Sequence, residues 1–302
     1  MSEPVENPAA LRALLQARGL APSKRFGQHF LIEPRLLDAI AGAAELGPGD
    51  VVLEVGPGTG TLTRRLLDRA ARVISVEIDA GLHRLVAETL GADPKLDLLH
   101  ADVLGSKTRL ADVVVGALDA ALAAVPGATF KVVANLPYNI STPFLAALAL
   151  RYRVPETMVL LVQKELAQGL ASPPGTREYS PIAVLLQSLG RIRTERTVGR
   201  DVFWPRPEVE SAVVVFERTT ADPSAALAVH PLVAHLFSQR RKTIGALLRK
   251  LPEADGGAPT AAAVERALTA AGLTGKERAE ALTPAAFFSL KRALEAPEIP
   301  RI

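Results

Sequence analysis

Apolar and polar positions follow two different periods along the chain, and these predict strands and helices in alternation. Short apolar runs bounded by turn residues indicate buried strands at 51–55, 72–78, 96–99, 130–136 and 157–163. Apolar residues at three- and four-residue spacing indicate helices at 8–18, 34–44, 62–70, 80–90, 108–125 and 143–151. Strands that alternate with helices favour a mostly parallel, doubly wound sheet with helices on both faces.

The second half of the chain changes character. A Pro/Gly-rich loop is followed by a predicted helix at 181–189 and a closing pair of strands at 191–198 and 211–217, and the segment 203–207 is too rich in proline for either element. After residue 223 the pattern is helical only, with helices expected at 225–237, 239–250, 261–271 and 284–294. We therefore expect an α/β domain over residues 1–220, with residues 1–7 disordered, and a small all-helical domain over 221–302.

Composition narrows the classes of protein. Hydrophobic residues make up 48% and charged residues 22%, which is ordinary for a globular protein with a core. The absence of cysteine excludes disulfides, thiolate metal sites and cysteine nucleophiles, and we expect no metal. No signal peptide or long apolar run is present, so we expect a cytoplasmic protein without membrane contact. The net charge of +3 is compatible with nucleic-acid binding but does not establish it.

Three features follow successive predicted strands. The first strand ends in Gly56-Pro-Gly-Thr-Gly60, where backbone N–H groups at a helix start can face a ligand. The spacing differs from the dinucleotide pattern G-x-G-x-x-G, which weakens the case for NAD. Glu77 ends the second strand, and its carboxylate can accept hydrogen bonds from both ribose hydroxyls. Asp102 ends the third strand and can accept a hydrogen bond from an adenine amino group. Because these strand ends meet at one sheet edge, the sequence predicts a nucleoside site there.

The fourth strand ends in Asn135-Leu136-Pro137-Tyr138. The Asn135 side-chain oxygen and a backbone carbonyl beside the proline can each accept a hydrogen bond from an exocyclic amino group. Tyr138 offers a ring on which a base can stack, and Pro137 stiffens the turn. Alone, such a tetrapeptide is more often an ordinary turn, but here it shares the sheet edge with the nucleoside site.

Together, Glu54-Val-Gly-Pro-Gly-Thr-Gly60, Glu77, Asp102 and the Asn-Leu-Pro-Tyr motif resemble an S-adenosylmethionine-dependent adenine-N6 methyltransferase with a Rossmann-like class I domain. Three more segments, 25–31, 203–214 and 237–243, are similar to those of the small-subunit rRNA adenine dimethyltransferases. The resemblance covers residues 24–290. It implies dimethylation at N6 of two adjacent adenosines near the 3′ end of small-subunit rRNA, a role in ribosome biogenesis, and a monomer whose partner is the small ribosomal subunit.

The resemblance also implies residue roles. The cofactor contacts would come from His29, Leu31, Gly56, Gly58, Glu77, Asp102 and Asn135. Asn135, Leu136, Pro137 and Tyr138 would form the catalytic motif, and Phe203 would sandwich the target base against Tyr138. RNA contacts would come from Arg206, Arg240, Arg241 and Lys242, the last three opening a helix. Position 29 more often holds Asn in this family, residue 206 often holds Pro, and the segment between Asp102 and Asn135 is longer than expected.

The chemistry implied is methyl transfer without a tuned general base. Oxygens that accept the N6 hydrogens steer the nitrogen lone pair and stabilise the developing positive charge. Four alternatives remain: a large-subunit adenine methyltransferase of the macrolide-resistance type, a DNA adenine methyltransferase, a non-catalytic ribosome-assembly factor and a NAD-linked oxidoreductase. The last is disfavoured by the glycine spacing, and the DNA enzyme by the small C-terminal region.

Overall fold

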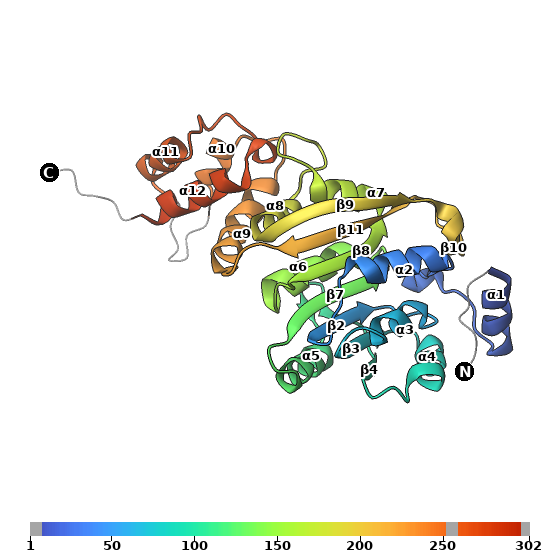
Figure 1. The fold of residues 1–302 in the computed structure, drawn as a ribbon. Helices are drawn as coiled ribbons and strands as arrows, with labels where there is room; N and C mark the ends of the chain where they lie inside the picture. The colour runs from blue at the N-terminus through green and yellow to red at the C-terminus, as the bar shows by residue number, and fades with distance from the viewer. Residues whose placement is uncertain (1–7, 252–258, 297–302) are drawn as a thin grey trace. The chain divides into compact units, whose positions relative to one another are not determined.

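The computed structural model of the chain describes residues 8–251 and 259–296, so the disorder expected for residues 1–7 lies outside the described residues. By its contacts the chain divides into two compact units (Figure 1). The first contains the described residues up to Ala167 together with Ile192–Arg218, and the second contains Gln168–Arg191 and the residues from Thr219 onward. The predicted boundary at 220 assigns residues 168–191 to the first domain, whereas by contact they group with the second unit.

A seven-stranded sheet forms the centre of the fold (Figure 1). Its strands are β2 (Asp50–Val55), β3 (Arg72–Glu77), β4 (Leu96–His100), β7 (Thr129–Asn135), β8 (Thr157–Gln163), β9 (Gly190–Val198) and β11 (Ser211–Arg218). Their order is β4-β3-β2-β7-β8-β11-β9. The pairs from β4 to β8 are parallel, and β11 is antiparallel to β8. The predicted mostly parallel α/β architecture is confirmed.

Helices of the first unit cover the sheet through apolar stripes. They are α2 (Pro34–Ala43), α3 (Thr61–Leu67), α4 (Ala80–Leu90), α5 (Asp112–Ala124) and α6 (Ser141–Arg151). Helix α1 (Pro8–Ala17) instead buries Leu11 and Leu15 in a separate cluster with Phe30 and the leucines of α4. Leucines of α2, α3 and α4 join alternate valines of the strands in one buried cluster. The helix starts have local causes: Pro34 occupies the first turn of α2, and the Asp79 carboxylate caps α4 at the N–H groups of Gly81 and Leu82.

Several short elements were not predicted. Phe30–Leu31 (β1) pairs with Phe203–Trp204 (β10), so the expectation that 203–207 contains no strand is wrong for its first two residues. The predicted helix at 108–125 begins only at Asp112, because Leu104–Ser106 (β5) and Arg109–Leu110 (β6) form a hairpin. Helix α7 (Lys164–Ala171) was missed. Strands of two or three residues are too short to show a period. The remaining short turns are Lys24–Phe26, Arg200–Val202 and Ala279–Ala281.

The second unit is mostly helical. Its helices are α8 (Pro181–Leu189), α9 (Ser224–Phe237), α10 (Ile244–Leu248), α11 (Ala261–Ala270) and α12 (Pro284–Glu295). They enclose an apolar cluster that includes Tyr179, Phe237 and Phe287. The predicted helix at 239–250 is wrong in its first half, because extended Thr243 separates α10 from α9. No helix in the described part of the chain is long and apolar enough to cross a membrane.

Candidate active site

A cavity of about 290 Å³ opens where β2, β3 and β7 end, and residues just after β4 also line it. Strand β2 leads on to β3 on one side and has β7 on the other, so the chain reverses its strand order at this point. Such a switch point is where open α/β sheets bind ligands. Residues 25–31 also line the cavity, so an N-terminal segment and the strand ends form its walls together.

The glycines of the loop that follows β2 are engaged with the protein itself. The N–H groups of all three glycines are used inside the protein: Gly56 donates to Val76 O at 2.9 Å, Gly58 to Glu77 Oε2 at 3.2 Å, and Gly60 to Pro57 O at 2.9 Å. These three N–H groups are therefore not free for a ligand, and the expectation that N–H groups of this loop and helix start face a ligand stays a prediction for the residues between and after the glycines. The glycines instead allow positive φ and close approach. A Cβ on Gly58 would lie 3.1 Å from the Phe30 ring.

Glu77 ends β3 as a buried carboxylate and lines the cavity. It accepts hydrogen bonds from Gly58 N at 3.2 Å and Asp79 N at 2.9 Å. Burial raises its pKa to about 7, although these N–H groups act in the opposite direction. Ile78, 40% exposed, presents an apolar side chain beside it. Asp102 is exposed and lines the cavity, and its Oδ1 accepts from Leu104 N at 2.9 Å.

Glu54 is a second buried acid that lines the cavity, one strand away from Glu77. Its Oε2 accepts from Thr63 Oγ1 at 2.7 Å and from Ser75 Oγ at 2.5 Å. Its Oε1 is buried and has no hydrogen-bond partner among the described residues. Burial raises the pKa of Glu54 to about 7 against the two hydroxyl donors, and neighbouring Glu77 adds to the rise. Two carboxyls that titrate near neutrality thus lie behind the glycine loop.

The Asn135–Tyr138 motif begins at the end of β7, the neighbour of β2 on the side away from β3, and lines the same cavity. Asn135 Nδ2 donates to His29 O at 3.1 Å, while its Oδ1 accepts no hydrogen bond from any described residue. Pro137 O already accepts from Ile140 N at 3.2 Å and Ser141 Oγ at 3.1 Å. The Leu136 carbonyl has no partner within the described part of the chain. Two free acceptor oxygens, Asn135 Oδ1 and Leu136 O, therefore belong to adjacent residues of the cavity lining.

Two aromatic rings meet beside these oxygens. The His29 imidazole stacks on the Tyr138 ring, with centroids 5.6 Å apart and planes at 26°. His29 Nδ1 lies 2.7 Å from Pro205 O and donates to it, since a carbonyl can only accept. Tyr138 Oη is 2.6 Å from the buried Ser211 Oγ. The segment 203–214 therefore anchors both rings at their polar edges.

The structure brings together the predicted cofactor and catalytic residues, but not Phe203, which was predicted to contact the target base. His29, Leu31, Gly56, Gly58, Glu77, Asp102 and the residues Asn135 to Tyr138 all line the cavity. Phe203 does not line it: its side chain is 3% exposed and belongs to the core cluster that also contains Leu31. The sandwich of a target base between Tyr138 and Phe203 stays a prediction, and in this structure pairing of β10 with β1 turns Phe203 inward. The ring that faces Tyr138 is His29.

The predicted RNA-contact residues differ in how they are engaged. Arg206 is 56% exposed in its side chain and pairs with Asp201 at 3.2 Å. Arg240 donates to the carbonyls of Arg177 and Tyr179 at 2.7 and 3.0 Å and lies over the Phe237 ring. It therefore braces the second unit as well as carrying charge. Arg241 and Lys242 are exposed in the turn before α10 rather than at the opening of a helix.

Sequence reasoning gave no role to Glu54, Ile78, Pro205 or Ser211. Glu54 could have been found, because it is the only acid inside the apolar run 51–55. Burial of a carboxylate costs free energy, so an acid in a buried strand indicates a specific role. Pro205 acts through its backbone carbonyl, which no side-chain pattern reports. No group of three or more His, Cys, Asp or Glu side chains that could hold a metal ion occurs in the described part of the chain.

Known proteins of one family match this chain over nearly its whole length. Residues 20–289 match the family model described as ribosomal RNA adenine dimethylase. A ribosomal RNA small subunit methyltransferase A from Phenylobacterium zucineum is 40% identical, covering 96% of this chain and 94% of its own. One from Acidothermus cellulolyticus is 37% identical, covering 94% and 93%.

Solved structures support the same fold. The 23S rRNA methyltransferase ErmE matches with a TM-score of 0.61 and 29% identity, over 88% of this chain and 100% of its own. A dimethyladenosine transferase from Plasmodium falciparum matches with a TM-score of 0.68 and 24% identity, over 87% and 96%. At that identity the second comparison speaks to the fold alone.

Proposed function

The chain belongs to the ribosomal RNA adenine dimethylase family and is an S-adenosylmethionine-dependent rRNA adenine dimethyltransferase, and from this premise we propose that it dimethylates N6 of two adjacent adenosines in the loop of the 3′-terminal hairpin of small-subunit rRNA. We propose further that the protein acts as a monomer during biogenesis of the small subunit. The observation that carries the proposal is the pair of free acceptor oxygens, Asn135 Oδ1 and Leu136 O, on one wall of the cavity.

An adenine N6 amino group has two hydrogens and a lone pair that is delocalised into the ring. Two oxygens that accept hydrogen bonds from both N–H groups localise the lone pair on nitrogen and orient it for attack on the methyl group. Because Asn135 Nδ2 is committed to His29 O, its oxygen is the atom available to the base. Pro137 O is occupied twice, which favours Leu136 O as the second acceptor. The same oxygens stabilise the positive charge that develops on nitrogen, and the excess proton passes to water.

The cavity residues at the ends of β2, β3 and β4 fit the cofactor. A nucleoside needs a carboxylate for its ribose hydroxyls and an apolar surface for its base, and Glu77 with the exposed Ile78 offers both. Asp102 would accept from the adenine amino group through its second oxygen, and Gly56 allows the methionine part to approach the backbone closely. S-adenosylmethionine, when bound there, supplies a methyl group on a sulfonium. Glu77, Asp102, His29 and Leu31 would hold it, while Asn135 lies between it and the target base.

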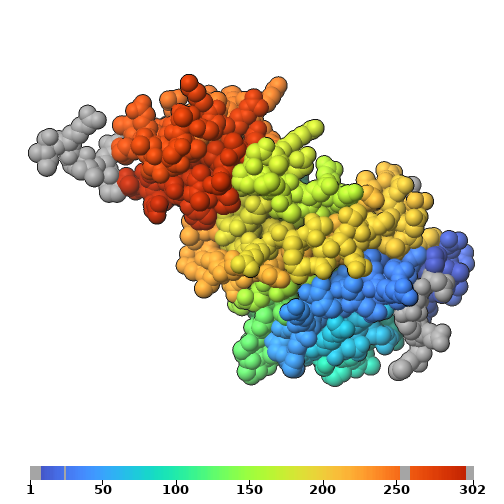
Figure 2. Space-filling view, turned by 45° about the horizontal axis from the view of Figure 1, so that its top comes forward, coloured from blue at the N-terminus to red at the C-terminus, as the bar shows by residue number. Residues whose placement is uncertain are grey.

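RNA contacts in this proposal come from exposed cations of each unit. Arg206 belongs to the first unit, and Arg241 and Lys242 to the second, where Arg240 fixes the turn that carries them. Such contacts neutralise phosphates, so affinity falls with salt. Strand β9 lies at one edge of the sheet, and most of its residues are exposed. It belongs to the segment coloured yellow in Figure 2.

The test is nucleoside mass spectrometry. The protein is incubated with S-adenosylmethionine and unmethylated small subunits, with large subunits in parallel, and the rRNA is digested. We expect N6,N6-dimethyladenosine from small subunits only. Asn135→Ala should lower the rate about 10²- to 10³-fold, the usual effect of removing one group that stabilises developing charge. Binding of S-adenosylhomocysteine by the variant reports that the site remains folded.

Product from large subunits alone would refute the choice of substrate and favour the type of activity named for ErmE. If methylation is lost in Asn135→Ala but small-subunit assembly in cells is unaffected, catalysis and biogenesis are separate roles. Full methylation by Asn135→Ala would overturn the assignment of the acceptors.

A further inference from the structure

We propose that Gln28 is a positioning residue for the cofactor, because its side-chain amide ties the N-terminal segment to Asp79, whose backbone orients Glu77. The inference rests on the proposed function, since it takes Glu77 as the carboxylate that would hold the cofactor ribose. Gln28 is half-buried and lines the cavity. It acts through Asp79 and Glu77 and takes no part in methyl transfer.

The amide of Gln28 is held at both ends. Its Oε1 accepts from Ser23 N at 2.7 Å, and its Nε2 donates to Asp79 Oδ2 at 3.3 Å. A backbone N–H can only donate and a carboxylate can only accept, so neither contact survives if the amide turns over. Gln28 therefore links the N-terminal segment to the start of α4 across 51 residues of chain.

Asp79 is the point where this link meets the cofactor site. Its Oδ1 caps α4 by accepting from the N–H groups of Gly81 and Leu82 at 2.8 and 3.1 Å. Its own N–H donates to Glu77 Oε1 at 2.9 Å, and this contact orients one oxygen of the ribose carboxylate. The Asp79 side chain thus receives hydrogen bonds from the N-terminal segment and from α4, while its backbone holds Glu77.

Apolar contacts bring the same segment to the same end of α4. A Cβ on Gly81 would lie 2.2 Å from Leu20 Cδ2, so the packing of Leu20 requires glycine there. Helix α1 buries its leucines with those of α4. These contacts end at residue 20, whereas the cavity is lined by residues 25–31. Gln28 is the polar contact that extends this docking into the cavity wall.

Docking of the segment and binding of the cofactor are therefore coupled. His29 and Leu31 can hold the cofactor only while the segment is docked, so the apparent affinity falls with the docked fraction. A typical net hydrogen bond corresponds to about a 2- to 12-fold change in an equilibrium constant. Loss of the contact between Gln28 and Asp79 should weaken cofactor binding by up to that factor, and saturating cofactor should restore docking.

An exchange of amide and carboxylate tests the contact itself. Gln28→Glu sets two carboxylates against each other, and Asp79→Asn sets two amide NH₂ groups against each other. Asparagine also caps helices, so α4 keeps its start. The double variant restores one donor and one acceptor in exchanged positions. Gln16→Glu, at an exposed position of α1, is the control for the added charge.

Binding, turnover and docking are measured separately on the full chain. Calorimetry gives the dissociation constant of S-adenosylhomocysteine without any reaction. Assays with unmethylated small subunits give kcat and the KM for S-adenosylmethionine. Brief digestion of the cofactor-free protein with trypsin gives the rate of cleavage after the exposed Arg25, identified by fragment mass. That rate reports how often the segment leaves its docked position.

We expect each single variant to bind S-adenosylhomocysteine about 2- to 12-fold more weakly than wild type. The KM for S-adenosylmethionine should rise in parallel, while kcat at saturating cofactor stays within about twofold. Cleavage after Arg25 should be faster in both single variants. The double variant should return towards wild type in all three measurements, and Gln16→Glu should match wild type throughout.

Three results would overturn the proposal. Unchanged affinity in Gln28→Glu, with or without faster cleavage, would make the contact structural only. A double variant at least as weak as either single variant would show that pairing of donor and acceptor does not hold the segment. A fall in kcat at saturating cofactor, with affinity intact, would assign Gln28 to the RNA. The proposed function fails on a separate observation: wild type that makes no N6,N6-dimethyladenosine refutes it, whatever the binding constants show.

Discussion

Replacing Glu54 by glutamine should remove much of the pH dependence of stability in the first unit. The Glu54 carboxyl is 1% exposed, and burial raises its pKa from 4.5 to about 7. A folded-state pKa above the unfolded value means that the protein stabilises the neutral form. The stability that this provides is fully present below about pH 4.5 and is lost as pH rises through about 7.

The size of the effect follows from the shift. At 1.36 kcal/mol for each pKa unit, a rise from 4.5 to about 7 corresponds to about 3 kcal/mol over the whole titration. Between pH 5 and pH 8 the wild-type free energy of unfolding should fall by about 2–3 kcal/mol relative to Glu54→Gln. The variant has a cost of its own at every pH, because its amide NH₂ would occupy the place of Oε1, which has no partner among the described residues. The expected signal is the change with pH and not the absolute stability.

The assay is urea unfolding at pH 5, 6, 7 and 8, followed by tryptophan fluorescence. The chain has a single tryptophan, Trp204, and it lies in the first unit with Glu54, so its signal reports that unit. Glu165→Gln is the matched control, because Glu165 is exposed on α7 and its replacement leaves the buried titration in place. Parallel pH profiles for wild type and Glu54→Gln would refute the reasoning. Glu77, whose pKa is also raised to about 7, accounts for the dependence that remains.

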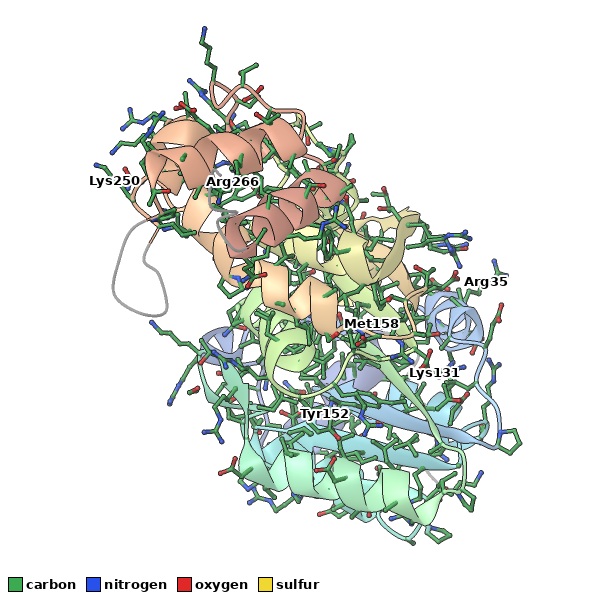
Figure 3. All side chains as sticks on the ribbon, turned by 90° about the vertical axis from the view of Figure 1, so that its left-hand side faces the viewer. Arg35, Lys131, Tyr152, Met158, Lys250 and Arg266 are labelled. Atoms are coloured by element: carbon green, nitrogen blue, oxygen red, sulfur yellow. The ribbon has the colours of Figure 1, made fainter. Side chains whose placement is uncertain are left out.

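Two further substitutions test local stability by urea unfolding. Glu45 is exposed and has a φ of +46°, so Glu45→Gly should stabilise by about 1 kcal/mol while Glu45→Ala should not; equal effects would contradict this. Lys131, labelled in Figure 3, pairs with buried Asp50 at 2.9 Å and donates to the carbonyls of Ala44 and Glu45. Lys131→Met should cost about 3–5 kcal/mol, against less than about 1 for Lys164→Met, which breaks the more exposed pair with Glu210. Similar losses in both would show that burial of the Lys131 pair is unimportant.

The sheet could be predicted because its strands are long enough to show a period and end in turn residues. The same reasoning located the acids Glu77 and Asp102 and the Asn135 motif, since parallel strands place their ends together. The prediction failed where contacts between segments distant in the sequence determine whether a side chain is buried. Pairing of β1 with β10 buries Phe203, and no local pattern reports that two residues pair across most of the chain. It also failed for groups that act through the backbone, such as Pro205 O, and it did not foresee that the three glycine N–H groups bond within the protein.

The glycine loop has a consequence for turnover. On the proposed reaction, two methyl groups on each of two adenosines require four molecules of cofactor, so the site must empty and refill between transfers. The N–H groups of Gly56, Gly58 and Gly60 are satisfied by the protein's own oxygens. A departing ligand therefore leaves no broken hydrogen bonds at these three positions, and the loop keeps its shape while the cofactor is exchanged. Repeated transfer on one bound RNA is compatible with a site that does not need its ligand to stay folded.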